Sequence, residues 1–277
     1  MAGFLGFGNY SKEGPGISKD APKKKTLFVF IETYFRNFWK FISINLVYSL
    51  MNVLIIPSGL ASAGITHVAR TIARDKHSFG LSDYFETVKK NWKQALIAGI
   101  INLIVYVLIV LNFIFVLSAQ GWFAIICQGV LTAVAFIFLV MNFYIWTLLI
   151  TFKFRLGQIY KNSFKFVFVN LKRNFLCMII LALVYAAAYG LLLLSTKFSI
   201  IYAFVVVCAI CVFPAFRFLL IQFCTFPSIV KYIIDPYYKE HPHEDIELRK
   251  SLGLEIEEEE NGEEEVFSDN ANQSADE

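Results

Sequence analysis

A long stretch of this chain contains no acidic side chain, and most of its apolar residues lie within that stretch. There is no Asp or Glu between Glu86 and Asp235. All 22 acidic residues of the chain lie at or before Glu86, or at or after Asp235. Gradient-coupled transport and acid/base catalysis within membrane helices normally use carboxylates. We therefore expect no enzyme activity, no catalytic residue, no cofactor and no metal site.

The composition predicts an all-α integral membrane protein. Apolar residues make up 57% of the 277 positions, above the roughly 45–50% that is usual for soluble domains. A run of about 20 apolar residues is long enough to cross a bilayer as a helix. Five such runs are predicted as full spans: 38–56, 95–117, 122–150, 175–194 and 199–216.

The distribution of Lys and Arg predicts a sixth membrane segment. The four basic clusters contain 7 residues in 1–40, 6 in 70–93, 6 in 153–173 and 4 in 231–250. Positively charged loops favour the cytoplasmic side. All four clusters and both termini lie there only if the chain returns through the membrane, or re-enters it, between positions 56 and 70. The alternative is one long kinked helix that leaves Arg70 outside.

The sequence of this return segment predicts a short helix buried by its neighbours. The thirteen residues of segment 57–69 rise only about 20 Å as a helix, which is less than the ~30 Å hydrocarbon core. Pro57 breaks the preceding helix, and the pairs Ser58/Ser62 and Gly59/Ala63 place small residues one turn apart. We therefore predict a six-segment bundle with five full spans and one short broken return segment packed closely against other helices.

Three similar triplets precede membrane segments, and they allow two interpretations. The triplets 36–38, 90–92 and 173–175 each contain a basic residue, an Asn and an aromatic residue. They indicate three degenerate helical-hairpin repeats, or they are the basic and interfacial aromatic residues expected wherever a span begins.

Charge and hydropathy divide the chain into four regions. A tail with 11 acidic residues and no Lys or Arg cannot bury a core, so it is predicted to be disordered. The regions are a basic leader at 1–37, a polytopic membrane domain at 38–230, a juxtamembrane cytoplasmic segment at 231–250 and the acidic tail at 251–277.

Six polar residues in or beside the apolar runs are candidate functional positions. A charge in a membrane segment must reach the interface or face a cavity, and Arg217 lies within the last apolar run. Asn side chains in lipid must find partners, so they form interhelical hydrogen bonds or line a path for a polar solute. The candidates are Arg70, Arg74, Arg155, Arg217, Asn102 and Asn142.

Several segments resemble a known family. The leader 7–25 and the segments 54–63, 70–94, 147–162 and 226–238 are similar to the YesL-type bacterial membrane proteins, whose domain of unknown function is numbered 624. The family usually has a Gly-Pro-Ala break after its first span, where this chain has Pro57-Ser58-Gly59. The resemblance implies a multi-pass protein of the bacterial cytoplasmic membrane, often encoded near carbohydrate ABC transporters. It supplies no functional residues.

Two functions follow as hypotheses. The first is a non-enzymatic accessory or regulatory protein of carbohydrate ABC uptake, whose partners are the lipid bilayer and a carbohydrate ABC permease or membrane sensor. The second is a facilitator or transporter of a small polar solute. Nucleic acid is not an expected partner, because the basic clusters adjoin membrane segments where anionic lipids explain them.

Overall fold

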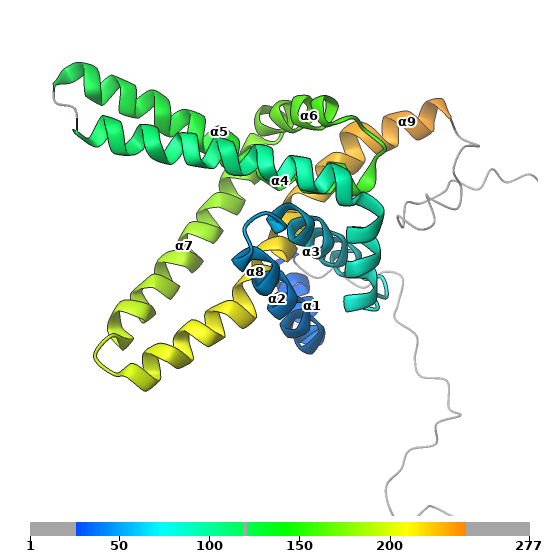
Figure 1. Cartoon of the computed structure of the whole chain (residues 1–277). Helices are drawn as coiled ribbons and strands as arrows, with labels where there is room; N and C mark the ends of the chain where they lie inside the picture. Colours follow the sequence, from blue (N-terminus) through cyan, green and yellow to red (C-terminus); the bar gives the residue numbers. More distant parts are fainter. Residues whose placement is uncertain (1–25, 119–120, 242–277) are drawn as a thin grey trace, which may run out of the picture. The chain divides into compact units, whose positions relative to one another are not determined.

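The computed structural model describes residues 26–118 and 121–241, and all regular structure in these ranges is helical. The chain divides into two units, Met1–Ile229 and Val230–Glu277. The predicted acidic tail and most of the predicted basic leader lie outside the described residues. The helices of the first unit (Figure 1) are α1 Thr26–Arg36, α2 Phe38–Val53, α3 Ser58–Ala73, α4 Leu81–Ser118, α5 Trp122–Thr151, α6 Leu156–Val169, α7 Leu171–Ser195 and α8 Ser199–Ile229.

The described part of the second unit is short. It contains a π-helical turn, η1, at Val230–Ile234, followed by α9 at Asp235–Glu240. Pro236 lies at the start of α9, where a helix needs no N–H donor and a φ near −65° is already suitable.

Four helices are long and apolar enough to cross a membrane, namely α4, α5, α7 and a helical stretch that begins with α8. These helices contain the last four predicted spans. Two helices begin earlier than the spans predicted at 95 and 175, because α4 begins at Leu81 and α7 at Leu171. In α4 no Gly or Pro interrupts residues 81–94, so the polar segment continues into the span as one helix, and Asp83 in its first turn favours the start.

Helices α2 and α3 are shorter than a full span and are joined by an apolar turn. Each has 16 residues, or about 24 Å of helix. The predicted span 38–56 was too long, because α2 ends at Val53 and Pro57 is the N-cap of α3. The three turn residues Leu54, Ile55 and Ile56 are each more than half exposed.

The backbone of this turn satisfies its own hydrogen bonds. The N–H groups of Ile55, Ile56 and Ser58 donate to the carbonyls of Asn52, Leu54 and Ile55, and Pro57 has no N–H to satisfy. Ile55 adopts a φ of 60°, which is rare for a β-branched residue. The turn therefore exposes apolar side chains while few backbone donors remain free, as an environment without water requires.

Helix α3 is the most enclosed helix of the first unit. Eleven of its 16 residues are buried, and it packs against α2, α4, α5 and α8. At Gly59 an added Cβ would lie 2.2 Å from the Ala95 carbonyl oxygen and 2.7 Å from Gly99 Cα. Gly59, one of the small residues predicted for close approach, thus lies where the backbones of α3 and α4 meet. The return helix itself is longer than expected, because it continues to Ala73.

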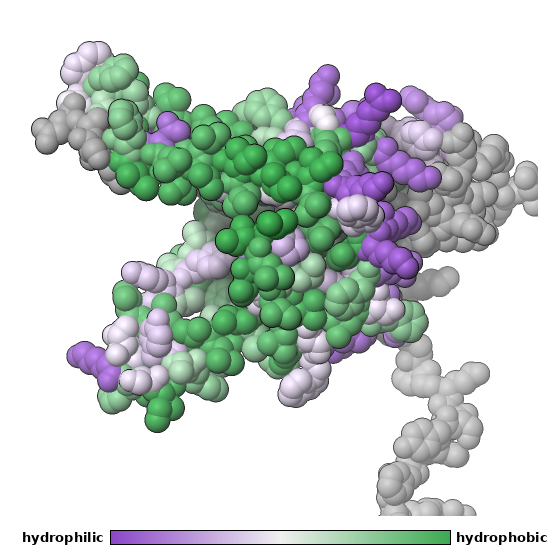
Figure 2. All heavy atoms as spheres, viewed as in Figure 1, coloured by the Kyte–Doolittle hydropathy of each residue, from purple (hydrophilic) through white to green (hydrophobic). Residues whose placement is uncertain are grey.

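The two later helix pairs bury few of their own side chains. Helices α4 and α5 pack on each other, as do α7 and α8, and only 11% of the most apolar window of α4 and of α7 is buried. Figure 2 shows apolar side chains over the α4–α5 pair and hydrophilic side chains gathered near the start of α4 and around α6.

The three triplets do not occupy identical places. Asn37 separates α1 from α2, Asn91 lies inside the continuous helix α4, and Asn174 lies in the first turn of α7. The side-chain amides of Asn37 and Asn91 donate to carbonyls four residues earlier, whereas that of Asn174 donates to the carbonyls of Phe166 and Val167 in α6.

Candidate functional site

Two arginines one turn apart end α3. Arg70 is only 8% exposed, and its guanidinium donates to Thr151 Oγ1 of α5 at 2.5 Å. Its other terminal nitrogen lies 3.3 Å from His67 Nδ1. Arg74 is the C-cap of the helix. The guanidinium carbon of Arg74 lies 4.6 Å from the centre of the Phe226 ring, and its Nη1 is buried without a hydrogen-bond partner.

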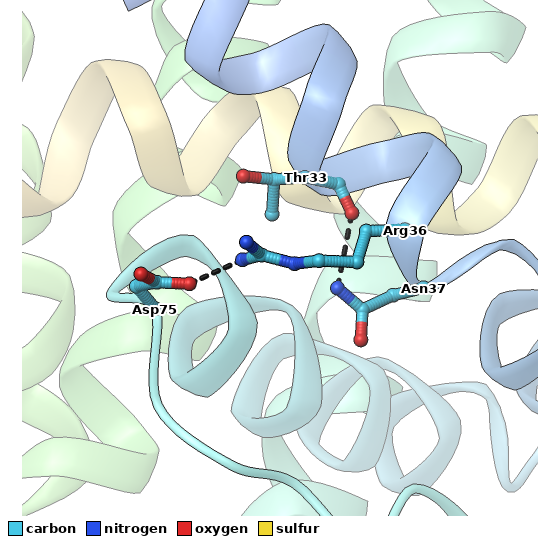
Figure 3. Close-up of polar contacts among 4 residues, drawn as sticks. All are labelled: Thr33, Arg36, Asn37 and Asp75. Carbon is cyan, nitrogen blue, oxygen red and sulfur yellow. Dashed lines mark hydrogen bonds and ion pairs between the residues drawn. The ribbon is translucent and has the colours of Figure 1, made fainter. Parts of the chain in front are cut away.

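The nearest carboxylates in sequence are directed elsewhere. Asp75 forms an ion pair with Arg36 from the end of α1 (Figure 3). Asp83 accepts hydrogen bonds from the Ser78 hydroxyl and the Phe79 N–H at the start of α4. Among the residues that the structure describes, no carboxylate forms an ion pair with Arg70 or Arg74.

The end of α3 stabilises these charges only partly. Partial negative charge at a helix C-terminus favours a cation by about 0.3–1 kcal/mol, whereas burial of one ion without a counter-ion costs several kcal/mol. Burial lowers the pKa of Arg74. Burial and the charges of Arg74 and Arg70 lower the pKa of Lys76 in the following loop. Positive charge is therefore concentrated here beyond what the local backbone compensates.

Arg217 lies among aromatic side chains contributed by several helices. Its guanidinium carbon is 4.7 Å from the centre of the Phe218 ring, and it interacts electrostatically with the phenol groups of Tyr48 on α2, Tyr106 on α4 and Tyr185 on α7. Its Nε is buried without a hydrogen-bond partner. The neighbours of this side chain are thus a phenyl ring and three phenol groups, none of which carries a formal charge.

Asn102 and Asn142 form the centre of an interhelical network. Asn102 Nδ2 donates to Asn142 Oδ1 at 2.8 Å, and this bond joins α4 to α5. The Tyr160 hydroxyl of α6 lies 2.8 Å from Asn102 Oδ1 and donates to it. Asn142 Nδ2 donates to the Phe138 carbonyl within its own helix. This network fits the hydrogen-bonding interpretation of the membrane asparagines.

A second buried amide joins α2 to α8 next to Pro214. Asn45 is fully buried. Its Nδ2 donates to the Cys211 carbonyl at 2.6 Å, and its Oδ1 accepts from the Ala215 N–H at 2.7 Å. An uninterrupted α-helix would join these two backbone groups directly. The Asn45 side chain bridges them where proline disturbs the helix.

The structure brings together only some of the predicted residues. Arg70 lies one turn from Arg74, and Asn102 contacts Asn142, but Arg217 shares no contact with either pair. Arg155 is exposed at the N-terminus of α6, where its backbone N–H donates to Gln158 Oε1 at 2.9 Å. It therefore contributes to the start of a helix rather than to a shared site.

Sequence reasoning missed several partners of these residues. Thr151, Tyr160 and Asn45 carry no motif, and each is far in sequence from the group that it contacts. The only available signal was polarity within apolar runs, which does not identify a partner. In the part of the chain that the structure describes, no group of three or more His, Cys, Asp or Glu side chains could hold a metal ion.

These features define an α-helical membrane protein with buried polar contacts between its helices. A family model described as a protein of unknown function, DUF624, matches residues 41–113. The predicted resemblance to this domain is confirmed over these residues, which include α3 and its contact with α4. Searches of curated proteins and of solved structures found no match.

Proposed function

We propose that this protein is a non-enzymatic accessory or regulatory component of carbohydrate ABC uptake. In this proposal it acts in the bacterial cytoplasmic membrane by packing its helices against those of a permease or a membrane sensor. The observation that carries the proposal is the low burial of the two long helix pairs, α4–α5 and α7–α8. The carbohydrate link rests on the resemblance to the YesL-type proteins.

The exposed faces supply a large surface for another membrane protein. Phe115 on α4 is 76% exposed and Phe204 on α8 is 67% exposed. In Figure 2 the α4–α5 and α7–α8 pairs form two arms with open space between their ends. Helices of a partner can fill such space with close van der Waals contacts, which drive helix association in lipid.

The proposal includes a six-segment topology. In it, α2 enters the membrane from the cytoplasmic side and α3 returns to the same side. Neither helix crosses fully, because each provides only about 24 Å of helix, which is shorter than the hydrocarbon core. The turn between them is apolar, as a turn inside the membrane requires. The four other segments cross fully, which is one full span fewer than the five expected from the sequence, because α2 has only 16 residues. The three helix pairs are then degenerate hairpins, of which the first is the shortest.

Arg217 favours a second candidate function, the facilitated passage of a small polar solute. Its guanidinium and the three neighbouring phenol groups could bind a polar molecule at membrane depth. The asparagines support this candidate less well, since Asn102 and Asn142 bind each other.

Affinity purification from native membranes tests the two proposals against each other. The tagged chain, expressed at its native level and solubilised in mild detergent, should copurify with a carbohydrate permease subunit or a membrane sensor. The same preparation, reconstituted alone in proteoliposomes, should take up no labelled sugar above empty liposomes. Saturable uptake by the chain alone, lost in Arg217→Gln, would instead support the facilitator.

A further inference from the structure

The end of α3 carries two guanidinium groups on one helix face, because residues four apart lie one above the other. Arg70 is held in place by neutral side chains, Thr151 and His67. Thr151 donates its own hydroxyl hydrogen to the Thr147 carbonyl, so its oxygen is free to accept from Arg70. The guanidinium of Arg74 lies over the ring of Phe226. Both planar groups are therefore positioned before any ligand arrives.

The charge and the donors of this pair are not fully used by the protein. Arg74 Nη1 is buried and has no partner. A guanidinium has five N–H donors, and the neutral contacts of Arg70 occupy only part of them. Asp75 is paired with Arg36, and Asp83 caps the start of α4. Asp75 and Asp83 therefore leave a concentration of positive charge and unused donors at this point.

We propose that the guanidinium groups of Arg70 and Arg74 form a binding site for a phosphate group. Arg74 is the nearer of the two to the surface, because it is half-buried while Arg70 is buried, and the phosphate reaches it first. Arg70 supplies a second positive charge from a buried position one helical turn earlier. Two planar donor groups one helical turn apart suit the several oxygens of a phosphate better than the two oxygens of a single carboxylate.

The phosphate has two chemical sources, a lipid headgroup of the adjoining leaflet or a soluble phosphate ester. Both present the same oxygens to the site. The inference goes beyond the proposed accessory function and does not depend on it, since a phosphate can bind here whether or not the helices contact a permease.

Binding is tested on the purified full-length protein with two probes. In the first arm, inorganic phosphate is added in uncharged detergent at constant ionic strength, with chloride as the reference anion, and binding is measured from the rise in melting temperature. In the second arm, the protein is placed in nanodiscs of phosphatidylcholine with a minor share of phosphatidylglycerol. Native mass spectrometry then counts the retained phosphatidylglycerol molecules.

The variants separate a built site from general basic charge. Arg74→Gln should weaken binding about ten-fold or more. Arg74→Lys keeps the charge but loses the planar guanidinium that forms two parallel hydrogen bonds, so it should weaken binding less. Arg155→Gln removes an exposed basic residue and is the matched control. It should bind as the wild type does. If Arg70→Gln fails to fold, Arg74→Gln carries the test, provided that its melting temperature without phosphate stays near that of the wild type.

Each outcome of the two arms supports or overturns the phosphate-site proposal. Binding in the first arm alone identifies a soluble phosphate, retention in the second arm alone identifies a lipid headgroup, and both together support a site that accepts either. The proposal is overturned if neither probe binds the wild type, or if Arg155→Gln weakens binding as much as Arg74→Gln does.

Discussion

The contact between Gly59 and Gly99 makes a sharp prediction about stability. In Gly59→Ala the new Cβ would lie 2.2 Å from the Ala95 carbonyl oxygen, more than 1 Å inside the roughly 3.4 Å at which ordinary van der Waals contact begins. The obstructing atoms belong to the backbone of α4, so no side chain can rotate away. The two helices must separate, and the buried face of α3 loses its packing.

The expected cost follows from this geometry. Overpacking typically costs about 1–3 kcal/mol, and a backbone obstruction places Gly59→Ala near ~3 kcal/mol. At about 2–4 °C per kcal/mol for a chain of this size, the melting temperature should fall by about 6–12 °C. Gly99→Ala should behave similarly. The double variant should cost less than the sum, because both changes separate the same two helices.

A matched control is available in the same fold. At Gly129 of α5 a Cβ would meet nothing within 4 Å, so Gly129→Ala should melt at or slightly above the wild type, helped by up to about 1 kcal/mol of helix propensity. The assay is thermal unfolding of the wild type and the four variants in one detergent. Equal melting temperatures for Gly59→Ala and Gly129→Ala would refute close packing of α3 on α4.

Three further predictions concern other parts of the molecule. Asn45→Ala should lower the melting temperature, because the Cys211 carbonyl and the Ala215 N–H each lose a buried partner at a cost of about 1–3 kcal/mol. The control is Asn112→Ala, which should have little effect because the Asn112 amide donates to a carbonyl of its own helix. Equal losses of stability in the two variants would contradict the bridging role of Asn45. In a variant without native cysteines, Gly80→Cys should react with a membrane-impermeant thiol reagent only after cell lysis, and labelling in intact cells would exclude the six-segment topology. Any transport by the isolated protein should be insensitive to proton or sodium gradients, because positions 87–234 contain no carboxylate; gradient-driven accumulation in proteoliposomes would show this to be wrong.

Much of the helical organisation could be predicted from sequence, because it depends on local properties. Apolar length predicted five full spans, and four of them match the helices that can cross a membrane, whereas the first corresponds to the shorter helix α2. Pro57 marked the break before α3. The i, i+4 spacing of small residues predicted that Gly59 would lie at a close helix contact. Helix starts were predicted less well, since α4 begins well before the apolar run at 95. Hydropathy marks where a helix enters lipid, whereas caps and the absence of breakers decide where it begins.

The contacts of the candidate residues could not be predicted, because they depend on which helices meet. The sequence indicated that Asn102 and Asn142 each needed a partner, but 40 residues separate them and several other polar residues were available. For Arg217 the sequence favoured a side chain that reaches the interface and left a cavity as the alternative. Its position among tyrosines follows from the packing of α2 and α7 on α8 and from its interaction with Tyr106 of α4. A polarity pattern predicts that a partner exists, whereas tertiary packing determines which one it is.

The most direct test of the accessory function is site-specific photocrosslinking in native membranes. A photoreactive phenylalanine analogue replaces Phe204 on the exposed face of α8, and the control places it at Phe79, which is similarly exposed but lies in the loop before α4. We predict a discrete adduct with a carbohydrate permease subunit or a membrane sensor from position 204 and none from position 79. Adducts with lipid alone from position 204 would contradict the proposal that these helices pack against another membrane protein.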